Sequence, residues 1–210
     1  RSMRVTEFRD YLACPYRYYL RHRLRLGELR DSAVELDGAA FGSLAHEVLG
    51  AWAVGPAAAS TDAEAIAAFL DAALGDAVGR VHGAAPLAAI LVQAEQLRAR
   101  LARFARWQAE WAAQGWRIEA VETQPDENRA SLTVDGQPMF LRGRIDRIDV
   151  HEATGRRIIL DYKTSDAAKT PRQAHTANGH WVDLQMPLYR HLAAGMDLGG
   201  PVALGYILLP

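Results

Sequence analysis

The sequence predicts an α/β fold in which helices flank a mixed central sheet and a helical insert precedes most of the strands. Apolar residues recur at helical spacing up to about residue 115, strand-like runs follow from about residue 116, and a helix and a further apolar run come last. Half of the 210 residues are hydrophobic and under a quarter are charged. This composition and length fit one compact domain over residues 1–210.

The first helical patterns precede residue 55. Residues 6–20 are predicted as a helix with Thr6 as its candidate N-cap and an interruption at Pro15. In residues 41–52 the apolar side chains fall on one face at helical spacing, which predicts an amphipathic helix.

Residues 55–116 are rich in alanine and leucine and are predicted as a helical insert. Thr61 or Asp62 can cap one helix, and the region after Pro86 can form a second that runs through Trp107 or beyond. Low-complexity disorder is the alternative for the alanine-rich part. A stripe of large apolar residues, which disorder would not need, favours helices: Ile66, Phe69, Leu70 and Leu74.

Strand character begins near residue 116, which separates a helical part of about 1–115 from a sheet-bearing part of about 116–210. Strands are predicted over residues 118–122, 131–134, 140–150 and 157–164. The polar residues 165–180 are predicted as a loop. A helix capped by Asp183 is then expected to run through Leu192, and residues 202–208 form the last predicted strand.

Composition excludes several classes of protein. No apolar run approaches the roughly 18 to 20 residues that cross a bilayer, and no signal peptide is recognisable, so a cytoplasmic protein without a membrane partner is expected. The single cysteine, Cys14, cannot form an internal disulfide. An iron–sulfur cluster with four cysteine ligands cannot form within this chain either.

Positive charge is unevenly distributed, although the formal net charge is −1. Residues 1–30 hold eight arginines against three acidic residues. The candidates for contacts with a nucleic-acid backbone are Arg17, Arg21, Arg23 and Arg25. A second arginine series lies on a predicted helix, at Arg98, Arg100, Arg103 and Arg106. Two solvated surfaces without a specific role are the alternative.

Two predicted strands are expected to form a hairpin that carries the chemistry. If Val150 pairs with Arg157, antiparallel pairing keeps the sum of partner numbers at 307 and places Asp146 opposite Asp161. Directly opposed side chains share a face with Cβ atoms about 4.5 to 5.5 Å apart, and Lys163, two positions on, shares that face. A register slip of one residue would send one carboxylate to the other face.

Two facing carboxylates repel each other unless a cation lies between them, so the pair predicts a divalent metal site. Oxygen ligands suit Mg²⁺ or Mn²⁺, which polarises a phosphodiester and lowers the pKa of a bound water. Lys163 beside the metal can position that water, neutralise charge on the phosphate or act as a base. The alternative is a surface hairpin in which Lys163 forms a salt bridge with one aspartate.

Five motifs follow one another along the chain. They are Tyr11-Leu-Ala-Cys-Pro-Tyr-Arg-Tyr-Tyr-Leu20, Phe41-Gly-Ser-Leu-Ala-His-Glu-Val-Leu49, the stretch Glu119–Glu122, the strands Gly143-Arg-Ile-Asp-Arg-Ile-Asp149 and Asp161-Tyr-Lys-Thr164, and Gln185-Met-Pro-Leu-Tyr189. The ordered set covers essentially the full chain and resembles the RecB/AddB-like branch of the PD-(D/E)XK nuclease superfamily. Bacterial helicase–nucleases carry such a domain. The resemblance implies a restriction-endonuclease-like fold.

The resemblance also implies roles for individual residues. Carried over one by one, it makes His46, Asp146 and Asp161 metal ligands and the backbone carbonyl of Tyr162 an additional ligand. It makes Lys163 catalytic together with the two aspartates. Taken alone, a histidine beside an apolar stripe is more often a structural residue. As a ligand, His46 tilts the expected metal slightly towards Mn²⁺.

Three further residues are expected to support the site. Glu122 is favoured over its neighbour Glu119 as a ligand or water-orienting group, and the strand register decides which one faces the site. Gln185 and Tyr189 lie four residues apart on a predicted helix, so they share a face and can reach the DNA backbone or brace Lys163. Simple packing of this pair is the alternative.

Cys14 marks a departure from part of the family. Some relatives bind an iron–sulfur cluster through a cysteine near this position and three more near the C-terminus, and those three are absent here. Either the chain belongs to a cluster-free group or it was cut before them. Its start, Arg1-Ser-Met3, and its end, Ile207-Leu-Leu-Pro210, favour a domain excised from a larger protein.

The expected function is a metal-dependent DNA nuclease, specifically an exonuclease of DNA repair, recombination or end processing in the bacterial cytoplasm. The expected partners are DNA, as single strands or duplex ends, and a helicase or ATPase module in the same or a partner chain. Two alternatives stay open: a catalytically silent DNA-end-binding module, which the intact motif residues disfavour, and a hydrolase of small phosphorylated metabolites, a small-molecule phosphodiesterase.

Overall fold

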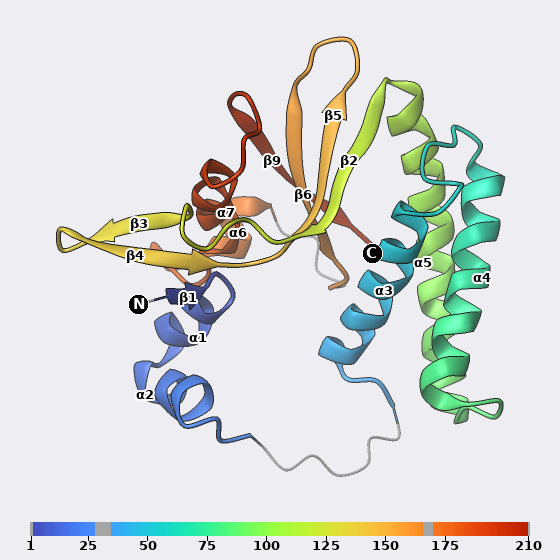
Figure 1. Ribbon diagram of the computed structural model, residues 1–210. Coiled ribbons are helices and arrows are strands. Elements are labelled where there is room, and N and C mark those ends of the chain that lie inside the picture. The colour runs from blue at the N-terminus through green and yellow to red at the C-terminus, as the bar shows by residue number, and fades with distance from the viewer. Residues whose placement is uncertain (1, 28–34, 166–169, 210) are drawn as a thin grey trace.

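Figure 1 presents the computed structural model, which describes residues 2–27, 35–165 and 170–209. Helices α3, α4 and α5 lie together on one side of the molecule. The two larger sheets, helices α6 and α7 and the N-terminal helices make up the rest (Figure 1). Among the described residues, no helix combines the length and the apolar character needed to span a membrane.

The helical layer consists of α3 (Gly38–Ala53), α4 (Ala63–His82) and α5 (Ala88–Ala113). Its boundaries follow from capping: the carboxylate of Asp62, rather than Thr61, accepts a hydrogen bond from the backbone N–H of Glu64 and caps α4. Ile66, Leu70 and Leu74 of the predicted stripe are fully inaccessible to solvent, and Phe69 is partly buried against the same core. The helices of the predicted insert are therefore confirmed.

The helix predicted over residues 6–20 is broken into shorter pieces. They are α1 (Glu7–Ala13), α2 (Pro15–Tyr18) and the π-helical turn η1 (Tyr19–Arg23). Cys14, between the first two, is extended because the residue before a proline disfavours the helical conformation. Thr6 occupies the N-cap position of α1, as predicted, but its side chain makes no cap hydrogen bond.

The strands form two larger sheets, which confirms the mixed α/β class. The four-stranded sheet has the order β2 (Trp116–Thr123), β5 (Ile145–His151), β6 (Arg157–Lys163) and β9 (Val202–Leu208). The three-stranded sheet has the order β1 (Ser2–Arg4), β4 (Gln137–Arg142) and β3 (Ser131–Val134). The four-stranded sheet is mixed because β2, β5 and β6 are antiparallel neighbours, whereas β6 and β9 run parallel.

The single strand predicted over residues 140–150 is wrong, because the chain leaves one sheet at Arg142 and enters the other at Ile145. Gly143 lies at the crossing. A Cβ atom there would lie 2.7 Å from the Leu192 side chain and 3.0 Å from that of Val5. Only glycine therefore allows the backbone to pass this close to its neighbours.

The segment after β6 is predicted as a loop, and its residues 166–169 lie outside the described residues. Short elements follow: α6 (Pro171–His175), β7 (Thr176–Ala177) and β8 (His180–Trp181). Thr170 and Gln173 form a capping box at the start of α6. The loop prediction is therefore wrong for residues 171–177 and for His180, where β8 begins.

Helix α7 (Gln185–Ala194) begins close to the predicted position. Leu184 occupies the N-cap position, but the Asp183 carboxylate still accepts a hydrogen bond from the backbone N–H of Gln185 at 2.7 Å. The predicted helix start is thus off by one residue, whereas the expected role of Asp183 in satisfying a free N–H group is confirmed.

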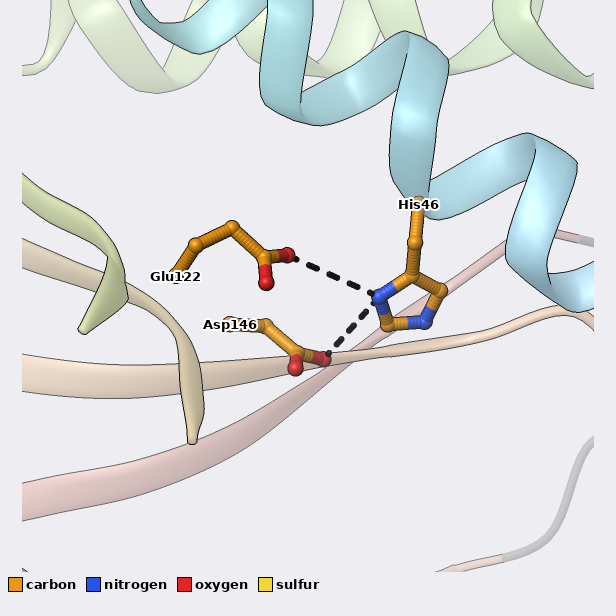
Figure 2. Close-up of side chains that lie close together, drawn as sticks. All are labelled: His46, Glu122 and Asp146. Atoms are coloured by element: carbon orange, nitrogen blue, oxygen red, sulfur yellow. Dashed lines mark ion pairs between the residues drawn. The ribbon is translucent and has the colours of Figure 1, made fainter. Parts of the chain in front are cut away.

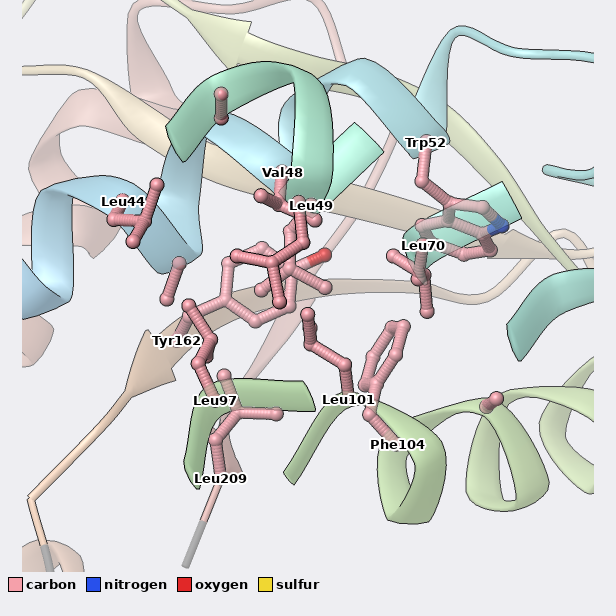
Figure 3. Packing of buried hydrophobic residues seen from close by; sticks show 14 of the residues in the cluster. Leu44, Val48, Leu49, Trp52, Leu70, Leu97, Leu101, Phe104, Tyr162 and Leu209 are labelled. Atoms are coloured by element: carbon pink, nitrogen blue, oxygen red, sulfur yellow. The ribbon is translucent and has the colours of Figure 1, made fainter. Parts of the chain in front are cut away.

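Two apolar cores enclose the four-stranded sheet. The first packs α3, α4 and α5 against side chains of β6 and β9, among them Tyr162, which Figure 3 shows among Leu49, Leu97 and Phe104. The second packs α7 and the three-stranded sheet against other side chains of β5 and β6. Strands β5 and β6 are consequently held from both sides, which fixes the residues at their ends.

Candidate metal centre and active site

A cleft of about 1100 Å³ opens at the end of β6, between α3, the β4–β5 junction and α7. Asp146, Asp161 and Lys163 all line it. The predicted register is confirmed over four pairs, from Val150 with Arg157 to Arg147 with Leu160, and every pair sums to 307. Asp146 and Asp161 come one step beyond the last of these pairs, so the pairing directs both to the same cleft.

Three ligand-type side chains from three elements converge in this cleft (Figure 2). The Nδ1 atom of His46, on α3, lies 3.7 Å from Oδ2 of Asp146 and 4.0 Å from Oε1 of Glu122. One ligand atom from each residue lies within 4.8 Å of the other two. Imidazole nitrogen and carboxylate oxygen are the donor types that Mn²⁺ and Mg²⁺ accept, so these residues fit a divalent cation.

Glu122 reaches the cleft because β2 contains a bulge. In the antiparallel pairing of β2 with β5, the residue numbers of each pair sum to 267 up to Ile118 and to 268 from Ala120 onwards, so β2 has one extra residue between them. The extra residue brings Glu122 into line with Asp146, while Glu119 turns away and pairs with Arg157 at 2.7 Å. Glu122 also has a φ of 49°, which is uncommon for a residue other than glycine and is typical of functional sites.

Asp161 takes part in a different set of contacts from Asp146. Its Oδ1 atom accepts hydrogen bonds from Gln185 Nε2 at 2.8 Å and from the Tyr189 hydroxyl at 3.1 Å. Its Oδ2 atom lies 2.7 Å from Lys163 Nζ. Lys163 in turn donates to Oε1 of Gln185 at 2.9 Å. Gln185 therefore binds the aspartate and the lysine at once and fixes their relative positions.

Burial strongly raises the pKa of the Asp146 carboxyl group. Removal from solvent and the nearby negative charge of Asp161 raise the pKa of its carboxyl group to about 6, against the opposing effects of His46 and of the backbone N–H of Tyr162, which donates to Oδ2 at 3.0 Å. Desolvation and a like charge both penalise the ionised form. A bound cation would relieve both penalties, which is a second observation in favour of a metal centre.

Tyr162 contributes its backbone to the site and its side chain to the core. The phenol is buried, and burial raises the pKa of its hydroxyl. It lies 3.5 Å from Nη1 of Arg147, whose guanidinium is fully buried and donates two hydrogen bonds of 2.6 Å to Asp149. The buried ion pair was not anticipated, although strand alternation places Arg147 and Asp149 on the face opposite to Asp146.

A second chain of contacts was also missed, because it joins elements distant in sequence. Lys163 Nζ lies 5.2 Å from the centroid of the Tyr206 ring, on β9. The Tyr206 hydroxyl lies 2.7 Å from Nε2 of His175, and Nδ1 of His175 lies 3.0 Å from the carbonyl oxygen of Asp183. The segment after β6 is thereby linked to the lysine.

The predicted basic residues of the N-terminal segment are exposed but do not line the cleft: Arg17, Arg21, Arg23 and Arg25. Arg21 pairs with Asp10 at 3.3 Å. Arg1 and Arg30 lie outside the described residues. On α5, Arg98 pairs with Asp71 and Glu95.

Four further arginines lie elsewhere in the structure, one on α5 and three along the cleft. Arg100, on α5, donates to the carbonyl oxygens of Thr164 and Leu209 and thereby ties the ends of β6 and β9 to the helix. Arg4, Arg142 and Arg144 line the cleft. Sequence reasoning missed this second group, although Arg142, Arg144 and Asp146 alternate along the chain.

The fold and the converging acidic, histidine and lysine side chains form a candidate metal centre of the kind that hydrolases use, in a mixed α/β scaffold. The family model of the PD-(D/E)XK nuclease superfamily matches residues 2–210. The chain therefore belongs to the PD-(D/E)XK nuclease superfamily, whose membership implies a nuclease that uses a divalent metal. No curated protein matches the chain.

Proposed function

We propose that the protein is a DNA nuclease of the RecB/AddB-like branch, which hydrolyses phosphodiester bonds with Mg²⁺ or Mn²⁺. The observation that carries the proposal is the convergence of His46, Glu122 and Asp146 beside the braced pair of Asp161 and Lys163. Superfamily membership supports the nuclease class, and the ordered motifs support the finer branch.

His46, Glu122 and Asp146 are the residues that would hold the cation, with Asp161 and the Tyr162 carbonyl as the further ligands expected from the motif. When bound, the cation supplies Lewis-acid polarisation of the phosphodiester and a lower pKa for a coordinated water. The residues of the chain arrange the rest of the reaction. Glu122 and Asp146 crowd negative charge where the cation is needed, and the burial of Asp146 and partial burial of Glu122 strengthen its binding.

Lys163 acts on the substrate. Its ammonium group is held by Asp161 and Gln185, and about a third of its side chain is exposed to the cleft. A fixed positive charge next to the phosphate stabilises the negative charge that develops during attack by water. Because the braces hold Nζ in place before the substrate arrives, little reorganisation is needed at the moment of reaction.

In the bacterial cytoplasm the protein would process DNA ends as an exonuclease during repair or recombination. It would do so as a single nuclease domain attached to a helicase or ATPase. The motif order supports it. Linear and circular single-stranded DNA of equal length test the mode, because an exonuclease degrades only the linear form. Efficient cleavage of the circle would contradict the exonuclease assignment.

The central experiment compares the wild type with the Lys163→Ala variant on single- and double-stranded DNA with Mg²⁺ or Mn²⁺. Loss of one fixed stabiliser of transition-state charge costs about 10²- to 10³-fold in kcat, and a loss of this size is expected. Circular dichroism checks that the variant is folded. If the wild type leaves every DNA intact but binds its ends, the protein is a silent end-binding module instead.

A further inference from the structure

The wall of the cleft formed by β1 and β4 carries positive charge that the metal centre does not use. Parallel pairing of the two strands places Arg4 directly beside Arg142. Both line the cleft, as does Arg144, two residues further along the chain. Cross-strand partners project from the same face of a sheet, so Arg4 and Arg142 present their side chains on the same side of β1 and β4.

The arginines of this wall differ in how well their charge is matched. Arg144 Nε lies 2.6 Å from Oε2 of Glu122. Arg142 Nε is buried and has no hydrogen-bond acceptor among the described residues, and its nearest carboxylate oxygen, on Glu127, lies 3.9 Å away. Arg4 is exposed, and within the described part of the chain it has no ion-pair partner. Arg4, together with the part of the Arg142 side chain that stays exposed, therefore offers donors to a ligand in the cleft.

The position of these donors relative to the metal centre indicates the chemistry of the ligand. Arg142 ends β4, Arg144 lies at the crossing between the two sheets and Asp146 lies on β5, and all three line the same cleft as the acidic cluster. A small phosphodiester has one phosphate group, which would be held at the metal centre. A polynucleotide carries a second phosphate one nucleotide away, and a planar guanidinium fork suits phosphate oxygens.

We infer that Arg4 and Arg142 form a phosphate-binding subsite for the backbone of a polynucleotide, beside the bond that is cleaved. The inference rests on the proposed function and adds to it the residues that hold the substrate backbone beside the metal centre, which would favour a nucleic-acid strand over a small phosphorylated molecule. Contacts of this kind contribute affinity without reading the base sequence. The basic N-terminal helices, which do not line the cleft, are not needed for it.

The test uses two probes, a fluorescein-labelled single-stranded oligonucleotide and bis(p-nitrophenyl) phosphate. The variants are Arg4→Ala, Arg142→Ala and the double variant, with Arg156→Ala as the matched control. Arg156 is equally basic and exposed, but it lies in the β5–β6 turn and does not line the cleft. Arg4→Gln and Arg142→Gln replace any alanine variant that circular dichroism shows to be unfolded.

Binding of the oligonucleotide is measured by fluorescence anisotropy in EDTA at several salt concentrations, and kcat/KM is measured for both probes with Mn²⁺. In the double variant we expect oligonucleotide Kd to rise at least about tenfold. The slope of log Kd against log salt should become shallower by about 0.7 for each phosphate that the protein no longer binds. The ratio of kcat/KM for the oligonucleotide to that for the small diester should fall by a similar factor, and Arg156→Ala should change neither quantity.

The two levels of the proposal fail in different ways. If the double variant binds the oligonucleotide within twofold of the wild type with the same salt slope, the subsite is disproved, whatever the wild type cleaves. If the wild type cleaves neither probe, but its oligonucleotide binding depends on Arg4 and Arg142, the subsite is supported and the nuclease function is disproved. If Arg156→Ala weakens binding as much as the double variant, general charge explains the effect and the subsite is disproved.

Discussion

Glu122 of β2 and Asp146 of β5 both approach Nδ1 of His46, at 4.0 and 3.7 Å, so two carboxylates from neighbouring strands face one imidazole on a helix. The two acids come into line only because β2 gains one residue at Glu119. This arrangement concentrates negative charge at a single point of the cleft. It also makes the protein's stability dependent on what binds there.

Divalent metal is expected to stabilise the folded protein. At a concentration 100 times its Kd, a ligand that binds only the folded state adds about 2.7 kcal/mol. Differential scanning fluorimetry with Mn²⁺ or Mg²⁺ should therefore raise Tm, and Glu122→Gln should remove most of the increase. Glu119→Gln is the matched control, because Glu119 pairs with Arg157 outside the cleft. An equal response of both variants would show that Glu122 does not bind the metal.

Without metal, Asp146 should make stability fall as the pH rises. Its pKa in the folded protein is about 6, whereas an unfolded aspartate has about 3.9, so the folded state holds the proton more tightly. The stabilisation is present below about pH 4 and is lost as the pH rises through about 6. Urea unfolding in EDTA should show that, between about pH 4 and 6, the free energy of unfolding of the wild type falls by about 2 to 3 kcal/mol relative to that of Asp146→Asn. Parallel curves for the two proteins would contradict the raised pKa.

Gln185 is expected to position Lys163 and Asp161 rather than to touch the substrate. Gln185→Leu keeps the size of the side chain but removes both contacts, and misplacement of a catalytic group by about 1 Å can cost about 100-fold. We expect kcat on DNA to fall about 10- to 100-fold with little change in KM. Tyr189→Phe removes only one of two donors to Asp161 and should have a smaller effect. The reverse ranking would assign the bracing to the tyrosine.

Tyr206 is expected to affect the lysine through its ring. Tyr206→Phe keeps the ring 5.2 Å from Lys163 Nζ and removes only the hydroxyl that meets His175. Tyr206→Leu removes both the ring and the hydroxyl. If the ring holds the ammonium group, the leucine variant should lower kcat several-fold more than the phenylalanine variant, as single-turnover cleavage with Mn²⁺ would reveal. Equal reductions would instead indicate that the hydroxyl contact with His175 matters.

Arg147 is predicted to be a stability residue. Arg147→Met leaves Asp149 as a buried carboxylate whose only remaining side-chain donor among the described residues is the indole N–H of Trp111, at 2.7 Å. Breaking a buried pair in this way costs about 3 to 5 kcal/mol, which urea unfolding can measure. The double variant Arg147→Met with Asp149→Leu should recover much of the loss, since no charge stays buried. An unchanged loss would attribute the effect to packing.

Local patterns in the sequence determined the main elements and the β5–β6 register. The amphipathic spacing of α3 and the apolar stripe of α4 repeat within a few residues, and a short hairpin fixes the pairing of Val150 with Arg157. Because that pairing is local, the sequence alone was enough to place Asp146 and Asp161 on one face. The position of His46 on a helix followed in the same way.

Contacts between distant segments decided the rest. One extra residue in β2 reverses which side chains face the cleft, so only the folded sheet could decide between the favoured Glu122 and Glu119. The crossing at Gly143 requires the close approach of Leu192 and Val5, and the parallel pairing of β1 with β4 brings together Arg4 and Arg142. Residues far apart in the chain meet only through tertiary packing, and no periodicity in the sequence records which of them will be neighbours.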